Sequence, residues 1–200
     1  MSKKIIILLH GVGSNGADLQ GLGDYWQASM PGVICESPNA PQHCDMGQGY
    51  QWFSVSGVTE ENRPARIVEA REQFDATLKG ILSKHQIGAE DQLILVGFSQ
   101  GSIMSLDALV RDALPLAGVV AFSGRLSSPA PYHPAADSKA ILIHGDADPV
   151  IPWTESRDAQ QKLQAAGVAV ELSVEAGVPH TITGAGVSTA DAFIRQQFAL

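Results

Sequence analysis

The sequence predicts an α/β protein with a mostly parallel sheet of about six to seven strands and helices on both faces. Short apolar, β-branched runs alternate with segments in which apolar residues recur every three or four positions. Strands that alternate with helices pair in parallel, because each helix returns the chain to the same edge of the sheet. The 200 residues, 44% of them hydrophobic, suit one buried core, so we expect a single domain over residues 1–200.

Each expected element follows from a local pattern. The first apolar run has five residues and is too short for a signal-peptide core or a membrane span, so we interpret it as a strand. The longest helix has one apolar face with three- and four-residue steps, and a later helix is closed by Gly167. The strands are expected at residues 5–9, 33–36, 93–98, 117–122, 140–143 and 168–174, and the helices at residues 67–82, 103–110, 159–166 and 187–194.

Two irregular segments remain. Residues 37–62 form a long segment rich in Pro, Gly, Gln and Asn, and connections of that length are usually functional. Residues 125–139 contain three prolines and are too short for a helical lid. We therefore expect a fold without a lid.

Composition and charge exclude several classes of protein. Thirteen Lys and Arg against 21 Asp and Glu give a net charge of −8, which repels nucleic acid and anionic membranes. The short first run predicts a cytoplasmic protein without stable membrane insertion. Cys35 and Cys44 lack CxxC spacing, so we expect reduced structural thiols, no disulfide scaffold and no thiolate metal site.

The run Gly97-Phe98-Ser99-Gln100-Gly101 stands between an expected strand and an expected helix. This is the context of a nucleophile elbow, a sharp turn that exposes a serine hydroxyl. Such a turn needs small residues two positions to either side of the serine, where backbones approach closely. A glycine-rich turn without chemistry is the alternative, but the context favours Ser99 as a nucleophile.

A serine hydroxyl is a weak nucleophile until a base takes its proton, so an acid and a histidine are expected later in the chain, in that order. His180 lies in the loop after the strand at residues 168–174 and is the predicted base. His10 and His144 each precede a glycine at a strand end and are expected to be structural. The other histidines, His43, His85 and His133, come too early for this order.

The acid has two candidates. Asp146 and Asp148 both follow the strand at residues 140–143, at the sheet edge where α/β proteins place catalytic groups. Either could instead be a turn or N-cap aspartate before the next helix. Spacing alone leaves the choice between them open.

The oxyanion that forms during acyl transfer needs two backbone N–H donors. The residue after the nucleophile, Gln100, supplies one, and Val12 in the loop after the first strand supplies the other. The same loop, Gly11-Val12-Gly13-Ser14-Asn15-Gly16, also matches the G-x-G-x-x-G pattern of dinucleotide sites, with Glu36 at a suitable distance for a ribose contact. A nucleotide-binding module is therefore an alternative, but it leaves Ser99 and His180 without a role.

Taken together, these motifs resemble the phospholipase/carboxylesterase family, which includes the acyl-protein thioesterases, and in particular its small bacterial esterases. The resemblance implies a minimal, lidless α/β-hydrolase fold, and it places the acid at Asp148. Thioesterases usually carry Asp after Trp-Phe, where this chain has Ser54, which counts against acyl-protein thioesterase activity. The matching runs are Leu9-His10-Gly11-Val12-Gly13, Pro38-Asn39-Ala40-Pro41, Trp52-Phe53, Gly97-Phe98-Ser99-Gln100-Gly101, His144-Gly145, Asp148-Pro149-Val150 and His180.

The sequence thus predicts a serine carboxylesterase that forms an acyl-enzyme at Ser99 and needs no metal or cofactor. The expected partner is a small-molecule ester with a short acyl group, and a homodimer is left open. Trp52, Phe53 and Trp153 are candidate walls of the acyl or alcohol pocket, with loop packing as an equal alternative. A thioesterase or lysophospholipase would use the same residues, and a silent hydrolase-fold binding protein is the alternative of another class.

Overall fold

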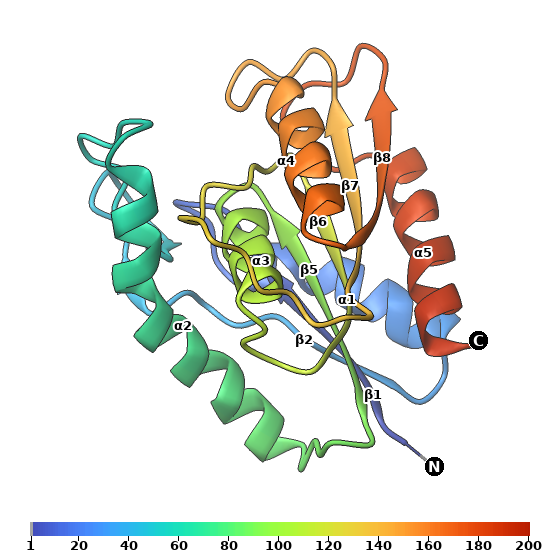
Figure 1. Ribbon diagram of the computed structural model, residues 1–200. Helices are drawn as coiled ribbons and strands as arrows, with labels where there is room; N and C mark the ends of the chain where they lie inside the picture. The colour runs from blue at the N-terminus through green and yellow to red at the C-terminus, as the bar shows by residue number, and fades with distance from the viewer. Residues whose placement is uncertain (1) are drawn as a thin grey trace.

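The computed structural model describes residues 2–200 and contains a six-stranded sheet between two layers of helices (Figure 1). Neighbouring strands in this sheet are all parallel, in the order β2-β1-β5-β6-β7-β8. The predicted fold class is confirmed, and each predicted strand is present. The strands are β1 (Lys4–Leu9), β2 (Val33–Glu36), β5 (Gln92–Phe98), β6 (Leu116–Phe122), β7 (Lys139–Gly145) and β8 (Ala169–Glu175).

Helices cover both faces of the sheet, as predicted. Successive side chains of a strand point to opposite faces, so Ile6 and Leu8 of β1 pack with Trp26 and Phe193, while Ile7 joins a second core on the other face. Helices α1 and α5 cover the first face, and α2, α3 and α4 cover the second. The helices are α1 (Ala17–Ser29), α2 (Arg63–Lys84), α3 (Gln100–Val110), α4 (Thr154–Ala165) and α5 (Gly184–Phe198).

Helix α1 was not among the predicted elements. Gly21 and Gly23 lower its helix propensity and dilute its apolar pattern. Gly23 is buried against the sheet, and a Cβ atom there would lie 3.3 Å from the Cβ atom of Cys35. The glycine therefore lets the helix approach β2 closely. Helix propensities do not include this packing contribution, because they describe a helix in isolation.

The segment 37–62 contains a short antiparallel hairpin, β3 (Gln42–His43) and β4 (Tyr50–Gln51). The hairpin is bonded to the loop after β1: Gly13 N donates to Tyr50 O and Tyr50 N donates to Ser14 O, both at 2.8 Å. The hairpin thus supports the loop after β1, in which Val12 was predicted to supply one oxyanion donor.

Helix α3 is buried along its whole length, from Gln100 to Val110. Its buried carboxylate, Asp107, accepts hydrogen bonds from Arg71 of α2 at 2.8 Å, from Arg111 at 2.9 Å and from the Ser128 hydroxyl at 2.8 Å. Removing one partner of such a cluster leaves a buried charge unpaired, which is costly. The cluster therefore joins α2, α3 and the segment 125–139.

Strand order explains where a site can form. From β1 the chain moves to β2 on one side and later returns to β5 on the other side of β1. Loops that leave the carboxyl ends of strands at such a switch point diverge and open a crevice. The loop after β1 and the turn after β5, which carries Ser99, border this crevice.

Candidate active site

The turn at Ser99 has strained backbone geometry. Ser99 has φ 54° and ψ −115°, values that non-glycine residues rarely adopt, and its N–H donates to Phe122 O at 3.0 Å. A Cβ atom at Gly97 would collide with Ser102 N, and one at Gly101 with Leu9 O. The two glycines are thus required because strand, turn and helix approach closely, as expected for a nucleophile elbow.

Ser99, His180 and Asp148 lie in one chain of contacts. The Nε2 atom of His180 is 3.0 Å from Ser99 Oγ, and its Nδ1 atom is 2.6 Å from Asp148 Oδ2. The His180 ring also packs against the Phe98 ring, with centroids 4.8 Å apart. A carboxylate at Nδ1 holds the proton there and leaves Nε2 free to accept the serine proton.

The Asp148 carboxylate is buried but well bonded. Its Oδ1 atom accepts the N–H groups of Val150 at 2.8 Å and Ile151 at 2.9 Å. Burial by itself would raise the pKa of Asp148, but the hydrogen bonds from His180 and from these two N–H groups outweigh it and lower the pKa. The group is therefore ionised at neutral pH and places a negative charge beside His180 Nδ1.

Asp146 makes different contacts. Its carboxylate accepts Gly177 N at 2.6 Å, and its own N–H donates to Glu175 O at 3.0 Å. Just before it, a Cβ atom at Gly145 would collide with Val178 O, so the loop from β8 crosses directly over the end of β7. Asp146 and Gly145 thus fix the loop that carries His180, a positioning role that sequence reasoning missed.

His144 and His10 are buried, and both rings are bonded on each side. His144 Nε2 is 2.7 Å from Ile151 O, which only accepts, so its Nδ1 atom accepts the Ser156 hydroxyl at 2.6 Å. Burial lowers the pKa of His144 and of His10, more than their hydrogen bonds raise it. Both histidines are neutral hydrogen-bonding residues of the framework.

The two predicted oxyanion donors border the turn. Val12 lies in a tight turn in which Ser14 N donates to Gly11 O at 3.2 Å, and Gly13 has the positive φ of 81° that such a turn favours. Gln100 is the first residue of α3, where backbone N–H groups lack helical partners. Within residues 2–200, no hydrogen bond leaves either Val12 N or Gln100 N.

The Gln100 side chain has a second role that sequence reasoning missed. It is 2% exposed, and its amide pairs with the backbone of the next loop: Oε1 accepts Trp52 N and Nε2 donates to Phe53 O, both at 2.7 Å. The Trp52 indole N–H donates to His10 O at 2.9 Å. The two loops beside the elbow are therefore bonded to each other and to α3.

The three aromatic residues that were candidate pocket walls, Trp52, Phe53 and Trp153, do not line the groove beside His180. Trp52 is 1% exposed and packs edge-on against Phe74, and Phe53 is 4% exposed in the same core, so both are loop-packing residues. Their backbone bonds to Gln100 turn the rings inward. Trp153 is half-buried before α4, with the Arg157 guanidinium 5.2 Å from its ring. None of the three lines the groove that His180 borders.

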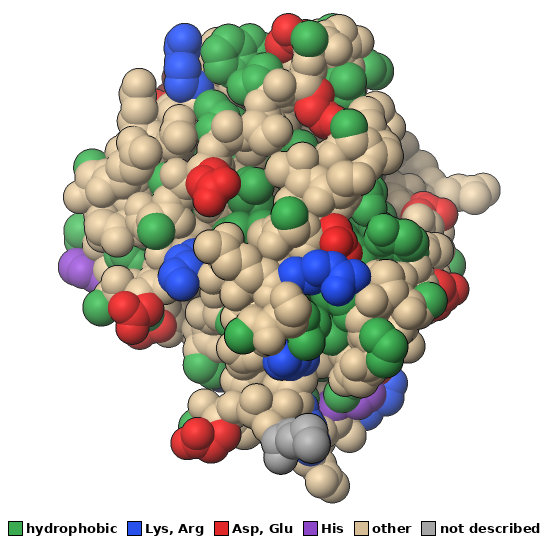
Figure 2. All heavy atoms as spheres, turned by 90° about the vertical axis from the view of Figure 1, so that its right-hand side faces the viewer, with side chains coloured by type: hydrophobic (Ala, Val, Ile, Leu, Met, Phe, Trp, Pro, Cys, Tyr) green, Lys and Arg blue, Asp and Glu red, His purple; other side chains and the backbone are tan. Residues whose placement is uncertain are grey.

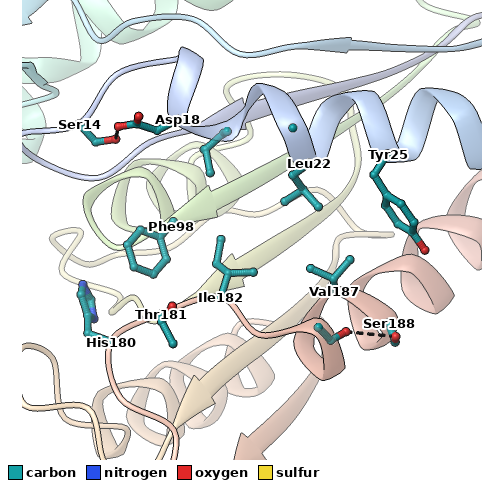
Figure 3. A pocket seen from close by; sticks show the side chains of 13 residues that line it. Ser14, Asp18, Leu22, Tyr25, Phe98, His180, Thr181, Ile182, Val187 and Ser188 are labelled. Carbon is teal, nitrogen blue, oxygen red and sulfur yellow. Dashed lines mark hydrogen bonds between the residues drawn. The ribbon is translucent and has the colours of Figure 1, made fainter.

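That groove runs from His180 between α1 and α5 and has a volume of about 740 Å³ (Figure 3). His180 and Phe98 lie at one end, and Tyr25 and Ser188 at the other. No sequence pattern indicated it, because its walls come from three distant segments. The lining residues are Ser14, Asp18, Leu19, Gly21, Leu22, Tyr25, Phe98, His180, Thr181, Ile182, Gly184, Val187 and Ser188.

The glycine-rich loop after β1 is unsuited to phosphate. Gly13 N donates to Tyr50 O, and Gly16 N donates to the Asn39 side chain at 2.8 Å, so these N–H groups cannot cradle a pyrophosphate. Glu36, the predicted ribose contact, is bonded to Lys84 at 2.6 Å. These contacts count against a nucleotide-binding module.

Residues 2–200 contain no group of three or more His, Cys, Asp or Glu placed to hold a metal ion. No helix among them combines the length and apolar character needed to cross a membrane. Acidic and basic side chains are scattered over the face that carries α5 (Figure 2).

A strained serine turn after a central parallel strand, with an aspartate and a histidine in loops after later strands, defines an α/β hydrolase. Residues 1–198 match the model of the Phospholipase/Carboxylesterase family. The chain therefore belongs to this family of ester-hydrolysing enzymes, as the motifs predicted.

Individual relatives agree with this assignment. Esterase YpfH of Escherichia coli (strain K12) is 33% identical over 181 residues, which cover 90% of this chain and 77% of that protein. The crystal structure of esterase PE8 matches with a TM-score of 0.89 and 38% identity, covering 98% of this chain and 93% of that one. Acyl-protein thioesterase 1 homolog 1 of Dictyostelium discoideum is 27% identical over 188 residues, covering 88% and 82%.

Proposed function

We propose that the protein is a serine carboxylesterase that hydrolyses small carboxylic esters with short acyl groups through an acyl-enzyme intermediate. The observation that carries this proposal is the contact chain from Ser99 Oγ to His180 Nε2, at 3.0 Å, and from His180 Nδ1 to Asp148, at 2.6 Å. Nucleophile, base and orienting acid must be linked in this order.

In the proposed reaction Ser99 attacks the ester carbonyl while His180 takes its proton. The oxyanion is bound by the N–H groups of Val12 and Gln100. His180 then donates the proton to the leaving alcohol, and the acyl group stays on Ser99 as an ester. Water, deprotonated by His180, attacks this ester, and His180 then returns the proton to Ser99 Oγ as its bond to the acyl group breaks and the acid is released. Asp148 holds the imidazole tautomer and stabilises the imidazolium in both halves.

The preference for short acyl groups is supported by the openness of the site. The segment 125–139 contains no helix that could close over Ser99, and the Trp52 and Phe53 rings lie in the core. A long acyl tail gains affinity only where apolar walls remove it from water, at about 0.8 kcal/mol per methylene. Without such walls on the acyl side of Ser99, affinity should stop rising after a few carbons of the acyl group.

Thioester hydrolysis is a second candidate, favoured by the Dictyostelium relative named above. The same residues would serve, with a thiol as leaving group. Turnover of matched oxygen esters and thioesters with the same acyl group separates the two activities. Faster turnover of long-chain thioesters would favour the thioesterase and overturn the preference for short acyl groups.

The test of the proposal is Ser99→Ala, with Ser56→Ala, an exposed serine, as the control. Ser99→Ala should lose labelling by a fluorophosphonate probe and reduce kcat with p-nitrophenyl acetate by at least about 10³-fold, since only binding and the oxyanion donors remain. Ser56→Ala should behave as wild type. Turnover that persists in a folded Ser99→Ala protein would refute the assignment.

A further inference from the structure

The groove between α1 and α5 is continuous with the proposed catalytic centre. His180, whose Nε2 atom is 3.0 Å from Ser99 Oγ, is one of its lining residues, and so is Phe98, the residue before the nucleophile. Beyond them the walls are formed mainly by half-buried apolar side chains, which include Leu19 of α1. Leu22 of α1 lies opposite Ile182 and Val187 (Figure 3). The groove therefore offers an apolar surface that begins at the reacting atoms.

The position of His180 decides which part of an ester this surface can meet. In the proposed reaction His180 gives its proton to the leaving oxygen, so the alcohol must depart on the side of the imidazole. The carbonyl oxygen points toward Val12 N and Gln100 N, and neither residue lines the groove. A substituent on the leaving oxygen thus projects along the groove.

We infer that the groove between α1 and α5 binds the alcohol part of the ester and selects apolar, uncharged alkyl or aryl alcohols. This inference rests on the proposed function, because it assigns a direction to the same reaction. Beyond the proposed function, the inference states that the groove that binds the alcohol sets the substrate selectivity.

The charge of the groove supports an uncharged alcohol. Its lining residues include no Lys or Arg, and the carboxylate of Asp18 stands at the end near His180, hydrogen-bonded to Ser14 at 2.5 Å. A phosphorylated alcohol would bring a second negative charge close to Asp18 with no cation to balance it. The groove therefore disfavours the headgroups of lysophospholipids.

Two glycines allow the groove to be filled without disturbing the core. Gly21 in α1 and Gly184 at the start of α5 both line it, and a Cβ atom at either position meets no atom within 4 Å. Leucine at either position would occupy the groove from opposite walls. Gly80 in α2, which is outside the groove and equally unobstructed, provides a matched control.

The experiment compares two substrate series in wild type, Gly21→Leu, Gly184→Leu and Gly80→Leu. One series varies the alcohol of acetate esters from methyl to hexyl, and the other varies the acyl group of ethyl esters. In wild type kcat/KM should rise up to about fourfold per methylene of the alcohol. Both groove variants should flatten this rise, with at least about a tenfold loss for hexyl acetate, and should leave ethyl esters near wild type. Gly80→Leu should follow wild type throughout.

A second measurement separates alcohol from acyl binding. The alcohol has left before the acyl-enzyme is hydrolysed, so the deacylation rate after a p-nitrophenyl acetate burst should be unchanged in Gly21→Leu. Loss on the acyl series together with slower deacylation would show an acyl site instead. No change in either series would show that the groove takes no part. Either result overturns this inference. The proposed reaction itself is tested separately by Ser99→Ala. A urea titration of each variant shows whether the variant is folded.

Discussion

Replacing Asp148 by asparagine tests the proposed triad at its most specific point. The Oδ1 atom of Asp148 accepts two backbone N–H groups, from Val150 and Ile151, while Oδ2 faces His180 Nδ1. In Asp148→Asn the amide oxygen must stay with the two N–H donors. The amide nitrogen, which only donates, then faces His180 Nδ1.

This arrangement forces the wrong imidazole tautomer. With a donor opposite Nδ1, that atom must accept, and the ring proton moves to Nε2, 3.0 Å from Ser99 Oγ. Nε2 can then no longer take the serine proton. We expect kcat to fall by about 10⁴-fold, or about 5 kcal/mol of transition-state stabilisation, while the fold survives.

Asp146→Asn is the matched control, because it is an exposed aspartate two positions away whose bond to Gly177 N an asparagine oxygen can keep. Steady-state hydrolysis of p-nitrophenyl acetate and urea unfolding should be measured for both variants. Asp146→Asn should stay near wild type in both. A folded Asp148→Asn that retains more than about a tenth of wild-type kcat, or a larger loss in Asp146→Asn, would refute the reasoning.

Two further predictions concern stability. Gln100→Ala leaves two buried backbone groups unpaired and should lower the free energy of unfolding in urea by about 2–5 kcal/mol, whereas Gln20→Ala, at an exposed glutamine of α1, should change it little; equal effects would contradict the role of the amide. Burial by itself would raise the pKa of Glu36, but hydrogen bonds from Lys84 and His85 outweigh it and lower the pKa. The stability from this carboxylate is thus present above its unfolded pKa of about 4.3 and lost as pH falls through the lower folded value. Glu36→Gln should lower the free energy of unfolding at pH 7 by less than about 1 kcal/mol, with a correspondingly small fall in Tm, and the difference should shrink as pH falls below about 4.3; a difference that grows on acidification would contradict this.

The sequence was informative wherever one local signal dominated. Apolar β-branched runs located every strand of the main sheet, most clearly the central strands β1, β5, β6 and β7, which are buried on both faces and have no polar alternation to obscure them. The glycines around Ser99 predicted a sharp turn for the reason that the structure supplies, the close approach of Ser102 and Leu9.

It was less informative where partners are distant in the chain. The aromatic residues at 52 and 53 had the composition of pocket walls, but the Gln100 amide binds their backbone and turns them into the core. Asp146 and Asp148 were equivalent by spacing and differ only in what they contact, Gly177 in one case and His180 in the other. The groove depends on α1, whose glycines concealed the helix.

The burial of α3 has a consequence for how the enzyme fails. Because no face of this helix meets solvent, the hydrogen-bonded amides beyond its first turn can exchange with water only when the core around them opens, and Ser99 immediately precedes its first residue. Ser99, the proposed nucleophile, is therefore held by a helix that does not open independently of the core. Under heat or denaturant, Ser99 should therefore keep its position in every molecule whose core is still folded.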